Sequence, residues 1–205
     1  MTQFFHIHPQ NPQQRLIDQS VEIIRDGGVI VYPTDSAYAI GCQLNNKEAL
    51  DRIRQIRGLD KNHHFTLVCR DLSEIATYAE VDNSTFRLLK SLTPGAYTFL
   101  LKATKEVPKR LLHPKRKTIG IRVPDCPIAL AMLETLGEPL MSSTLMMPGE
   151  TMPMFDPDEI FERLDNRVDL VIDGGPCSLD PTSVIDLYDS TPVVIRAGKG
   201  NVSQF

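Results

Sequence analysis

The sequence predicts an α/β protein built on a mixed sheet. Its 205 residues are 41% hydrophobic and 23% charged, which is ordinary for a globular protein with a buried core. Apolar runs of strand length alternate with amphipathic runs of helical period through most of the chain. Several strand-like runs follow one another near the C-terminus, which favours a mixed sheet over a purely parallel one. No repeat or low-complexity linker divides the chain, so we expect a single domain over residues 1–205.

The first half of the chain shows clear helix and strand boundaries. Asn11 and Pro12 supply an N-cap and a first-turn proline, and Gly27-Gly28 ends the helix that we expect between them. The apolar run that follows is a buried strand ended by Pro33, and Asp71 with Glu74 has the pattern of a capping box. The other expected elements are a helix over 46–57, a strand over 65–69, a helix over 84–92 and a strand over 97–101.

The second half is expected to be richer in strands. Asp125 is the expected cap of a helix that Gly137 ends, and the Met- and Pro-rich residues 146–155 lack periodicity and are expected to form a loop. A short helix is expected over 157–164. The expected strands cover 118–123, 140–144, 168–173, 183–187 and 193–196.

Charge and composition exclude several classes of protein. The net charge of −4 argues against a general nucleic-acid binder, and no apolar run approaches the roughly 18 residues of a membrane span, so we expect a cytoplasmic protein with no membrane partner. The four cysteines are far apart and form no Cys-x-x-Cys pair, so we expect free thiols and no metal site. One basic connection is a candidate surface for duplex RNA, through Lys109, Arg110, Lys115, Arg116 and Lys117.

Small hydroxyl and basic side chains gather at the predicted strand ends. Thr34, Asp35 and Ser36 follow the strand ended by Pro33, at the edge where open α/β sheets bind ligands; a hydrogen-bonded turn is the simpler alternative. Hydroxyls with several cations suit a ligand that carries phosphate or carboxylate. The chain has no Walker A loop, no Gly-x-Gly-x-x-Gly and no Gly-x-Ser-x-Gly. Asp35 is the best-placed carboxylate, but no convincing general base stands out.

Five segments, in order along the chain, resemble the YrdC-like family, which includes the threonylcarbamoyl-adenylate synthases, and most of all its YciO branch. Residues 33–41 (Pro-Thr-Asp-Ser-Ala-Tyr-Ala-Ile-Gly) are similar to the family's Pro-Thr-Glu-Thr-x-Tyr-Gly-Leu-Gly. The other similar segments are 93–98 (Thr-Pro-Gly-Ala-Tyr-Thr), 119–124 (Ile-Gly-Ile-Arg-Val-Pro), 181–186 (Pro-Thr-Ser-Val-Ile-Asp) and 195–198 (Ile-Arg-Ala-Gly).

The resemblance implies a twisted open mixed sheet with flanking helices and a large concave cavity. It implies synthesis of threonylcarbamoyl-AMP from threonine, bicarbonate and ATP with Mg²⁺, for modification of adenosine 37 in tRNA. By position, Thr34 and Tyr38 would contact the threonyl group, and Arg122, Ser183 and Arg196 would hold the nucleotide. Taken with the residues above, the expected substrate and nucleotide site is Thr34, Asp35, Tyr38, Arg57, Lys61, Arg122, Ser143, Thr144, Ser183 and Arg196.

The chain departs from the synthases at two motif positions. Where synthases resemble one another in Lys-x-Arg and Ser-x-Asn, this chain has Arg57-Gly58-Leu59 and Ser143-Thr144-Leu145. Losing a charge-assisted hydrogen bond costs roughly 1.5–3 kcal/mol, or about ten- to hundredfold in phosphate stabilisation. We therefore expect a protein that binds ATP, AMP or a carbamoyl-adenylate, with synthase activity weak or replaced by a reaction such as adenylate hydrolysis. The alternatives are a non-catalytic module for double-stranded RNA and, last, a carbamoyl-transfer domain with another acceptor.

Overall fold

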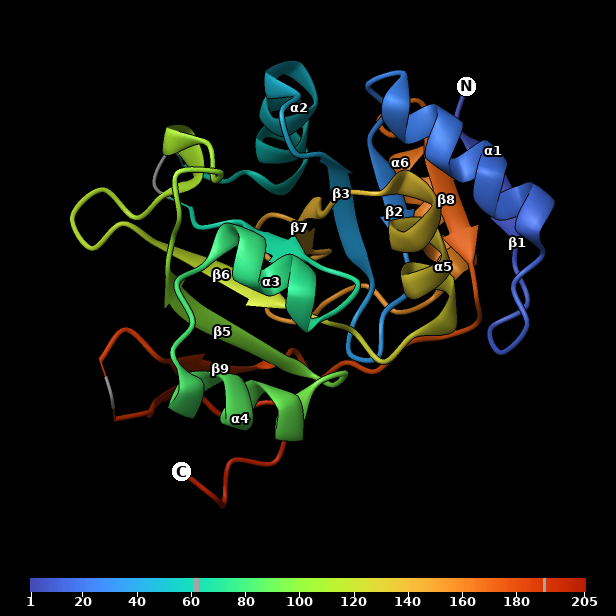
Figure 1. The fold of residues 1–205 in the computed structure, drawn as a ribbon. Coiled ribbons are helices and arrows are strands. Elements are labelled where there is room, and N and C mark those ends of the chain that lie inside the picture. The colour runs from blue at the N-terminus through green and yellow to red at the C-terminus, as the bar shows by residue number, and fades with distance from the viewer. Residues whose placement is uncertain (61–62, 190) are drawn as a thin grey trace.

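A single mixed sheet organises the molecule in the computed structural model, which describes residues 1–60, 63–189 and 191–205. Ten strands lie in the order β1-β8-β2-β3-β7-β4-β6-β5-β9-β10 (Figure 1). The first five along the chain are β1 (Gln3–His6), β2 (Ile30–Tyr32), β3 (Ala39–Gln43), β4 (Thr66–Val68) and β5 (Tyr97–Lys102). The others are β6 (Thr118–Arg122), β7 (Leu140–Thr144), β8 (Leu170–Asp173), β9 (Ser183–Asp186) and β10 (Val193–Arg196).

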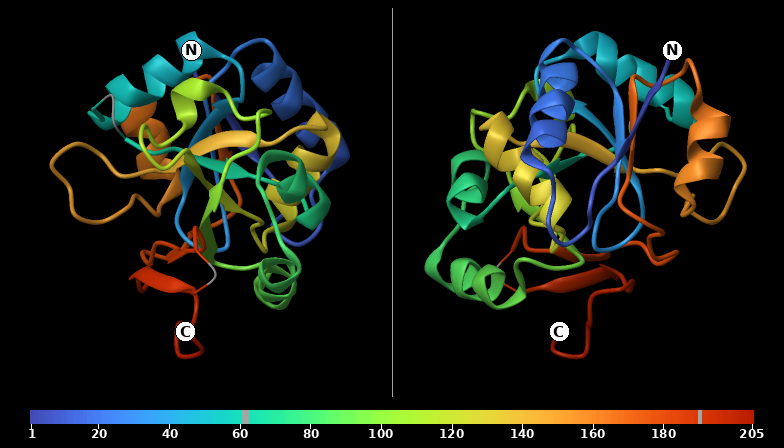
Figure 2. Two further views of the ribbon diagram at one scale, coloured as in Figure 1. Left: turned by 60° about the vertical axis from the view of Figure 1, so that its left-hand side comes forward. Right: turned by 90° about the vertical axis from the view of Figure 1, so that its right-hand side faces the viewer.

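Strand direction changes repeatedly across this sheet, as the sequence predicted. Parallel pairs join β1 to β8, β8 to β2, β4 to β6 and β5 to β9. The remaining neighbours are antiparallel, and a register shift between Val194 and Arg196 interrupts the pairing of β10 with β9. The N- and C-termini lie at opposite ends of the molecule (Figure 2).

Helices cover the sheet on both faces. On one face, α1 (Gln14–Arg25) packs beside α5 (Pro127–Leu136) over Ile30 and Leu170 (Figure 1). The alternate residues Val29 and Val31 belong to the other hydrophobic core, with apolar side chains of α2 (Lys47–Arg57) and α6 (Pro157–Leu164). Two further helices, α3 (Leu72–Tyr78) and α4 (Asn83–Leu92), and the short 3₁₀ helix η1 (Lys109–Leu111) complete the fold.

Helix capping explains most of the element boundaries. Asn46 accepts a hydrogen bond from Ala49 N at the start of α2, and Gly58 ends that helix with a left-handed φ of 62°. Asp71 accepts from Glu74 N as predicted, whereas the Glu74 carboxylate accepts from Arg70 N rather than Asp71 N, so only half of the capping box forms.

Two of the predicted helix starts were wrong. The first helix begins at Gln14 with Gln13 as its N-cap, because residues 8–11 instead fold into a turn around the His8 ring. The N-cap of α5 is Cys126 rather than Asp125, and Pro127 takes the first helical position. Strands β1 and β3 were not predicted, because their residues lack a run of β-branched side chains. The predicted bounds of β7, α6 and β10 are confirmed.

No helix in the described residues is long and apolar enough to cross a membrane. All four cysteines have free thiols, and Cys42, Cys69 and Cys126 are buried. Burial raises the pKa of Cys42 to about 12, so this thiol stays protonated and inert.

Candidate functional site

A cavity of about 270 Å³ opens on one face of the sheet. Its floor comes from strands that are distant in sequence but adjacent in the sheet: β7, β4, β6, β5 and β9. Because side chains alternate along a strand, Thr66, Gly120 and Ser142, which are paired across β7, β4 and β6, share this face. The site therefore lies mainly on the face of the sheet, and the loop after β2 and the ends of β6, β7 and β10 also contribute to it.

Gly120 keeps the floor of the cavity open. A Cβ at this position would lie 3.2 Å from Thr66 Oγ1 and 3.4 Å from Thr98 Cγ2. Glycine in the middle of a strand costs conformational entropy, and it often marks the close approach of a ligand or another backbone. Here it leaves room between two threonine side chains that both line the cavity.

Three arginine side chains enter the cavity from separate elements: Arg57 at the end of α2, Arg122 at the end of β6 and Arg196 at the end of β10. No carboxylate is among the described lining residues. The cavity therefore combines positive charge with many hydroxyl groups, which favours an anionic ligand.

Arg57 is buried and tied to strand β7. Its Nε donates to Met146 O at 3.0 Å, and its Nη1 donates to Ser143 Oγ. Burial lowers the pKa of this guanidinium, and no ion pair with a carboxylate offsets that cost among the described residues. Burying a cation without a counter-ion costs free energy, so the binding of an anion beside Arg57 would be favourable.

Arg122 is held in a different way. Its Nη2 forms a nearly buried ion pair with Asp35, and its Nη1 donates to Ser36 Oγ at 3.1 Å. The ion pair ties the loop after β2 to the end of β6 and fixes the direction of the guanidinium.

Arg196 reaches the rim of the cavity from an edge strand. The register shift in β10 skips Ile195 and pairs Arg196 with Val184, and an irregularity of this kind changes the direction of the side chains that follow it. Arg196 Nη2 donates to Thr182 O at 2.8 Å, and Thr182 Oγ1 lies 2.8 Å from Thr98 Oγ1.

Thr34 serves both the turn and the cavity. Its Oγ1 accepts from Ser36 N at 3.1 Å and donates to Ala37 O at 2.6 Å. Thr34 and Ser36 also line the cavity. The hydrogen-bonded turn that was the simpler alternative for this segment therefore also positions these two hydroxyls at the cavity.

The family model of the Sua5, YciO and YrdC proteins, described as "Telomere recombination", matches residues 22–198 of this chain. That match covers most of the chain. The chain belongs to the Sua5/YciO/YrdC family. It is 62% identical to YciO of Escherichia coli K12 over the full length of both chains, and 26% identical to the threonylcarbamoyl-AMP synthase of Bacillus subtilis over 89% of this chain and 53% of that one.

Solved structures of the family agree with the fold. The crystal structure of E. coli YciO matches over all of both chains with a TM-score of 0.96 at 62% identity. That of P. abyssi Sua5 complexed with L-threonine matches 96% of this chain and 58% of that one, with a TM-score of 0.88 at 22% identity. The predicted family and the predicted open mixed sheet with flanking helices are thereby confirmed.

The structure gathers most of the residues that the sequence selected from the family motifs. Six of them line one cavity: Thr34, Arg57, Arg122, Ser143, Thr144 and Arg196. Asp35 lies just behind it, paired with Arg122. Lys61 lies outside the described residues.

Tyr38 and Ser183 have other contacts. The Tyr38 hydroxyl donates to Gly175 O at 2.7 Å, and burial raises the pKa of this phenol. Ser183 Oγ donates to Gly200 O at 2.5 Å and accepts from Gly198 N at 2.8 Å. Neither is among the residues lining the cavity, and both side chains fix loops beside it.

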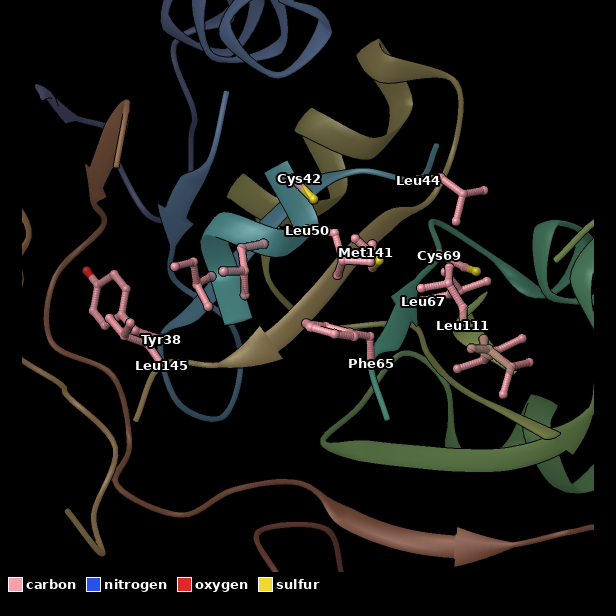
Figure 3. Packing of buried hydrophobic residues seen from close by; sticks show 14 of the residues in the cluster. Tyr38, Cys42, Leu44, Leu50, Phe65, Leu67, Cys69, Leu111, Met141 and Leu145 are labelled. Atoms are coloured by element: carbon pink, nitrogen blue, oxygen red, sulfur yellow. The ribbon is translucent and has the colours of Figure 1, made fainter. Parts of the chain in front are cut away.

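Leu59 and Leu145, the two positions predicted to depart from the synthase motifs, differ in environment. Leu145 is fully buried in the hydrophobic core beside Tyr38, and its N donates to Tyr38 O at 2.8 Å (Figure 3). Leu59 is half-buried and lines a separate shallow hollow with Gly58, Asp60, His63 and His64. Neither leucine lines the main cavity.

Sequence reasoning missed several lining residues. His63 and His64 belong to both the cavity and the neighbouring hollow, and they lie outside the five segments that resemble the family. Thr66 and Thr98 are hydroxyls within strands, and only the register of the sheet shows which face they occupy. A polar residue among apolar strand residues was the available signal.

None of the five cations of the basic connection lines the cavity. Arg116 forms a bidentate ion pair with Asp186 at 2.6 and 3.1 Å and stacks on Tyr188, and Arg110 donates to Leu44 O. Lys117 donates to Pro114 O, whereas Lys109 and Lys115 have exposed side chains. Binding of duplex RNA by this segment stays a prediction.

Proposed function

We propose that the cavity binds an anionic adenylate: ATP, AMP or threonylcarbamoyl-AMP. The observation that carries this proposal is the convergence of Arg57, Arg122 and Arg196 on one cavity whose described lining holds no carboxylate. Guanidinium groups bind phosphate through paired hydrogen bonds, and such bonds are stronger inside a protein than in water. An adenylate phosphate would supply the counter-charge that Arg57 does not find among the described residues.

The rest of the lining suits the remainder of such a ligand. Hydroxyls of Thr34, Ser36 and Thr144 can hydrogen bond a ribose or an acyl group, and Phe65 and Leu100 offer apolar contacts. The P. abyssi Sua5 structure contains L-threonine, and we extend that ligand to this chain as the acyl part of the adenylate.

We further propose that synthase activity is weak, or replaced by hydrolysis of the adenylate. Leu59 cannot replace the cation that synthases carry at its position, and a lost charge-assisted bond is worth roughly 1.5–3 kcal/mol. Leu145 is not the cause of this loss. In the fold of this chain its position is buried in the hydrophobic core, so an asparagine there would also be buried in the core. We therefore attribute the weak synthase activity to the Arg57–Leu59 segment.

Magnesium is expected only together with ATP. Proteins usually hold Mg²⁺ through one or two carboxylates as well as substrate phosphates. The described cavity lining offers hydroxyls but no carboxylate, and Asp35 is already paired with Arg122. The residues therefore do not fit a resident magnesium site, and no catalytic step is assigned to the ion.

Calorimetric titration tests this proposal. Purified protein is titrated with AMP and with ATP, each with and without threonine, and threonylcarbamoyl-AMP formation is followed by chromatography. We expect one nucleotide per chain and little synthesis. The absence of binding at millimolar nucleotide would reject the adenylate site, and synthesis as fast as that of the B. subtilis enzyme would reject the altered activity.

A further inference from the structure

Ser143, His63 and Arg57 form a hydrogen-bonded chain on one wall of the cavity. Ser143 Oγ lies 3.2 Å from His63 Nε2, and Arg57 Nη1 donates to the same oxygen. The three side chains come from β7, from the segment before β4 and from the end of α2, and all line the cavity. A hydroxyl within hydrogen-bond distance of an imidazole is the arrangement of an activated nucleophile and its base.

The donors and acceptors assign the proton. A guanidinium has donors only, so Ser143 Oγ accepts from Arg57. In the described part of the chain, His63 Nε2 is the acceptor within reach of the Ser143 hydroxyl. The Ser143 proton therefore points to His63 Nε2, and His63 carries its own proton on Nδ1.

The surroundings of His63 keep its ring in place and neutral. The ring meets that of Phe65 edge-on, with centroids 5.3 Å apart. Burial, followed by the charges of Arg57, His64 and Arg54, lowers the pKa of His63 to about 4, while Asp60 acts in the opposite direction. An anionic phosphate beside Arg57 would raise this pKa, so the imidazole becomes a better base when an adenylate is bound.

We propose that Ser143 and His63 are a nucleophile and general base that cleave an acyl- or carbamoyl-adenylate, a step that rests on the adenylate site proposed above. Ser143 Oγ attacks the carbonyl carbon of the mixed anhydride, and its proton passes to His63 Nε2. The bond between that carbon and the phosphate oxygen breaks, and AMP leaves with the electron pair.

Water completes the cycle. His63 releases its proton to solvent, takes another from a water molecule as that water attacks the carbonyl carbon, and passes it to Ser143 Oγ as the ester bond breaks. The net reaction converts one adenylate and one water into AMP, the free acid and one proton. Arg57 is a positioning residue for Ser143 in this scheme.

Rapid-quench kinetics with threonylcarbamoyl-AMP, made by a separate synthase and corrected for spontaneous decay, tests the pair. We expect a burst of AMP equal to the protein concentration and an acyl adduct on Ser143 in the quenched wild-type protein, detected by peptide mass spectrometry. Ser143→Ala should abolish the burst, and His63→Ala should slow cleavage by at least about hundredfold. Added imidazole should restore cleavage to His63→Ala, because free imidazole can replace the missing base. A purely structural role of His63 would not be rescued in this way.

The matched controls are Ser91→Ala and His8→Asn, whose parent side chains are exposed and outside the cavity. Both should cleave like the wild type. AMP titration separates the two proposals. If the wild type binds AMP but shows neither burst nor adduct, or if Ser143→Ala cleaves at the wild-type rate, the pair is wrong and the adenylate site stands. If the wild type binds no AMP, the adenylate site itself is wrong.

Discussion

Arg122 and Asp35 form an ion pair that is nearly buried at the edge of the cavity, with side chains only 9% and 11% exposed. The pair joins the loop after β2 to the end of β6, two segments that are far apart in sequence. It also divides the three cavity arginines into one that is neutralised and two, Arg57 and Arg196, that have no carboxylate partner among the described residues.

Asp35→Asn should lower stability and strengthen anion binding. Breaking a buried ion pair leaves Arg122 without its counter-charge, which costs about 3 kcal/mol of unfolding free energy. The freed cation should tighten AMP binding about tenfold, equivalent to roughly 1.4 kcal/mol. Urea unfolding and calorimetry measure the two effects. Asp158→Asn, at an exposed position on α6, is the control. Weaker AMP binding in Asp35→Asn would mean that the carboxylate itself contacts the ligand.

Arg196→Ala should weaken AMP binding with little effect on stability. The side chain reaches the cavity from an edge strand and hydrogen bonds mainly to Thr182 O, so its loss removes a ligand contact rather than core packing. We expect a ten- to hundredfold loss of affinity, from a charge-assisted bond of roughly 1.5–3 kcal/mol. Arg196→Lys keeps the charge but loses the planar fork, so its loss should be intermediate. Arg87→Ala on the exposed face of α4 should bind AMP normally; equal losses in both alanine variants would contradict the prediction.

Leu59→Arg and Leu145→Asn should behave differently, although each introduces the residue that the resemblance predicts for a synthase. Leu145 is fully buried, so an amide there loses apolar packing and hydrogen bonds to water, at a cost of about 3 kcal/mol in urea unfolding. Leu59 is half-buried beside the hollow, so an arginine can reach solvent or the ligand. Any gain in threonylcarbamoyl-AMP synthesis should come from Leu59→Arg alone. A stable Leu145→Asn protein with increased synthesis would contradict the placement of Leu145 in the core.

Stability should fall in acid partly through His63. Burial and the neighbouring cations lower the pKa of this imidazole to about 4, against about 6.5 in an unfolded chain. Between these values the unfolded chain binds a proton that the native protein does not, so the unfolding free energy decreases as the pH is lowered through this window. The ring is half-exposed, and solvent screening limits the effect to about 1 kcal/mol. His63→Asn removes the group, so its stability should fall by that much less between pH 7 and pH 4.5. If the unfolding free energy fell equally in the two proteins, the pKa of His63 would not be lowered in the native protein.

Local signals in the sequence predicted much of the fold. Capping residues such as Asn46, terminating glycines such as Gly58 and the apolar periods placed most helices and strands, because these signals act over a few residues. The missed strand β3 depends on its pairing with β2 and β7, which no local pattern reveals. The start of α1 was predicted wrongly because of His8. Its ring accepts hydrogen bonds from Gln10 N and Asn11 N, so these residues form a turn and Asn11 does not cap the helix.

The site residues that stand in motif segments could be predicted from the sequence. Those that only the register of the sheet brings to the cavity could not. Thr34, Arg122 and Arg196 stand in motif segments, and the structure places all three at the cavity. Thr66 and Gly120 reach the same cavity because β4 pairs with β6, and that pairing is a long-range property of the sheet. For the same reason, the sequence could not show that Leu145 faces the core while the neighbouring Thr144 lines the cavity.

Titration of AMP into the wild type and into an Arg57→Ala, Arg196→Ala double variant tests the central claim most directly. The claim is that Arg57 and Arg196, which have no carboxylate partner in the described part of the chain, make the cavity an adenylate site. It predicts one AMP per wild-type chain and a loss of at least about hundredfold in the double variant, since each lost contact is worth about tenfold or more. A wild type that takes up no AMP at millimolar concentration, or a double variant with an unchanged dissociation constant, would contradict it.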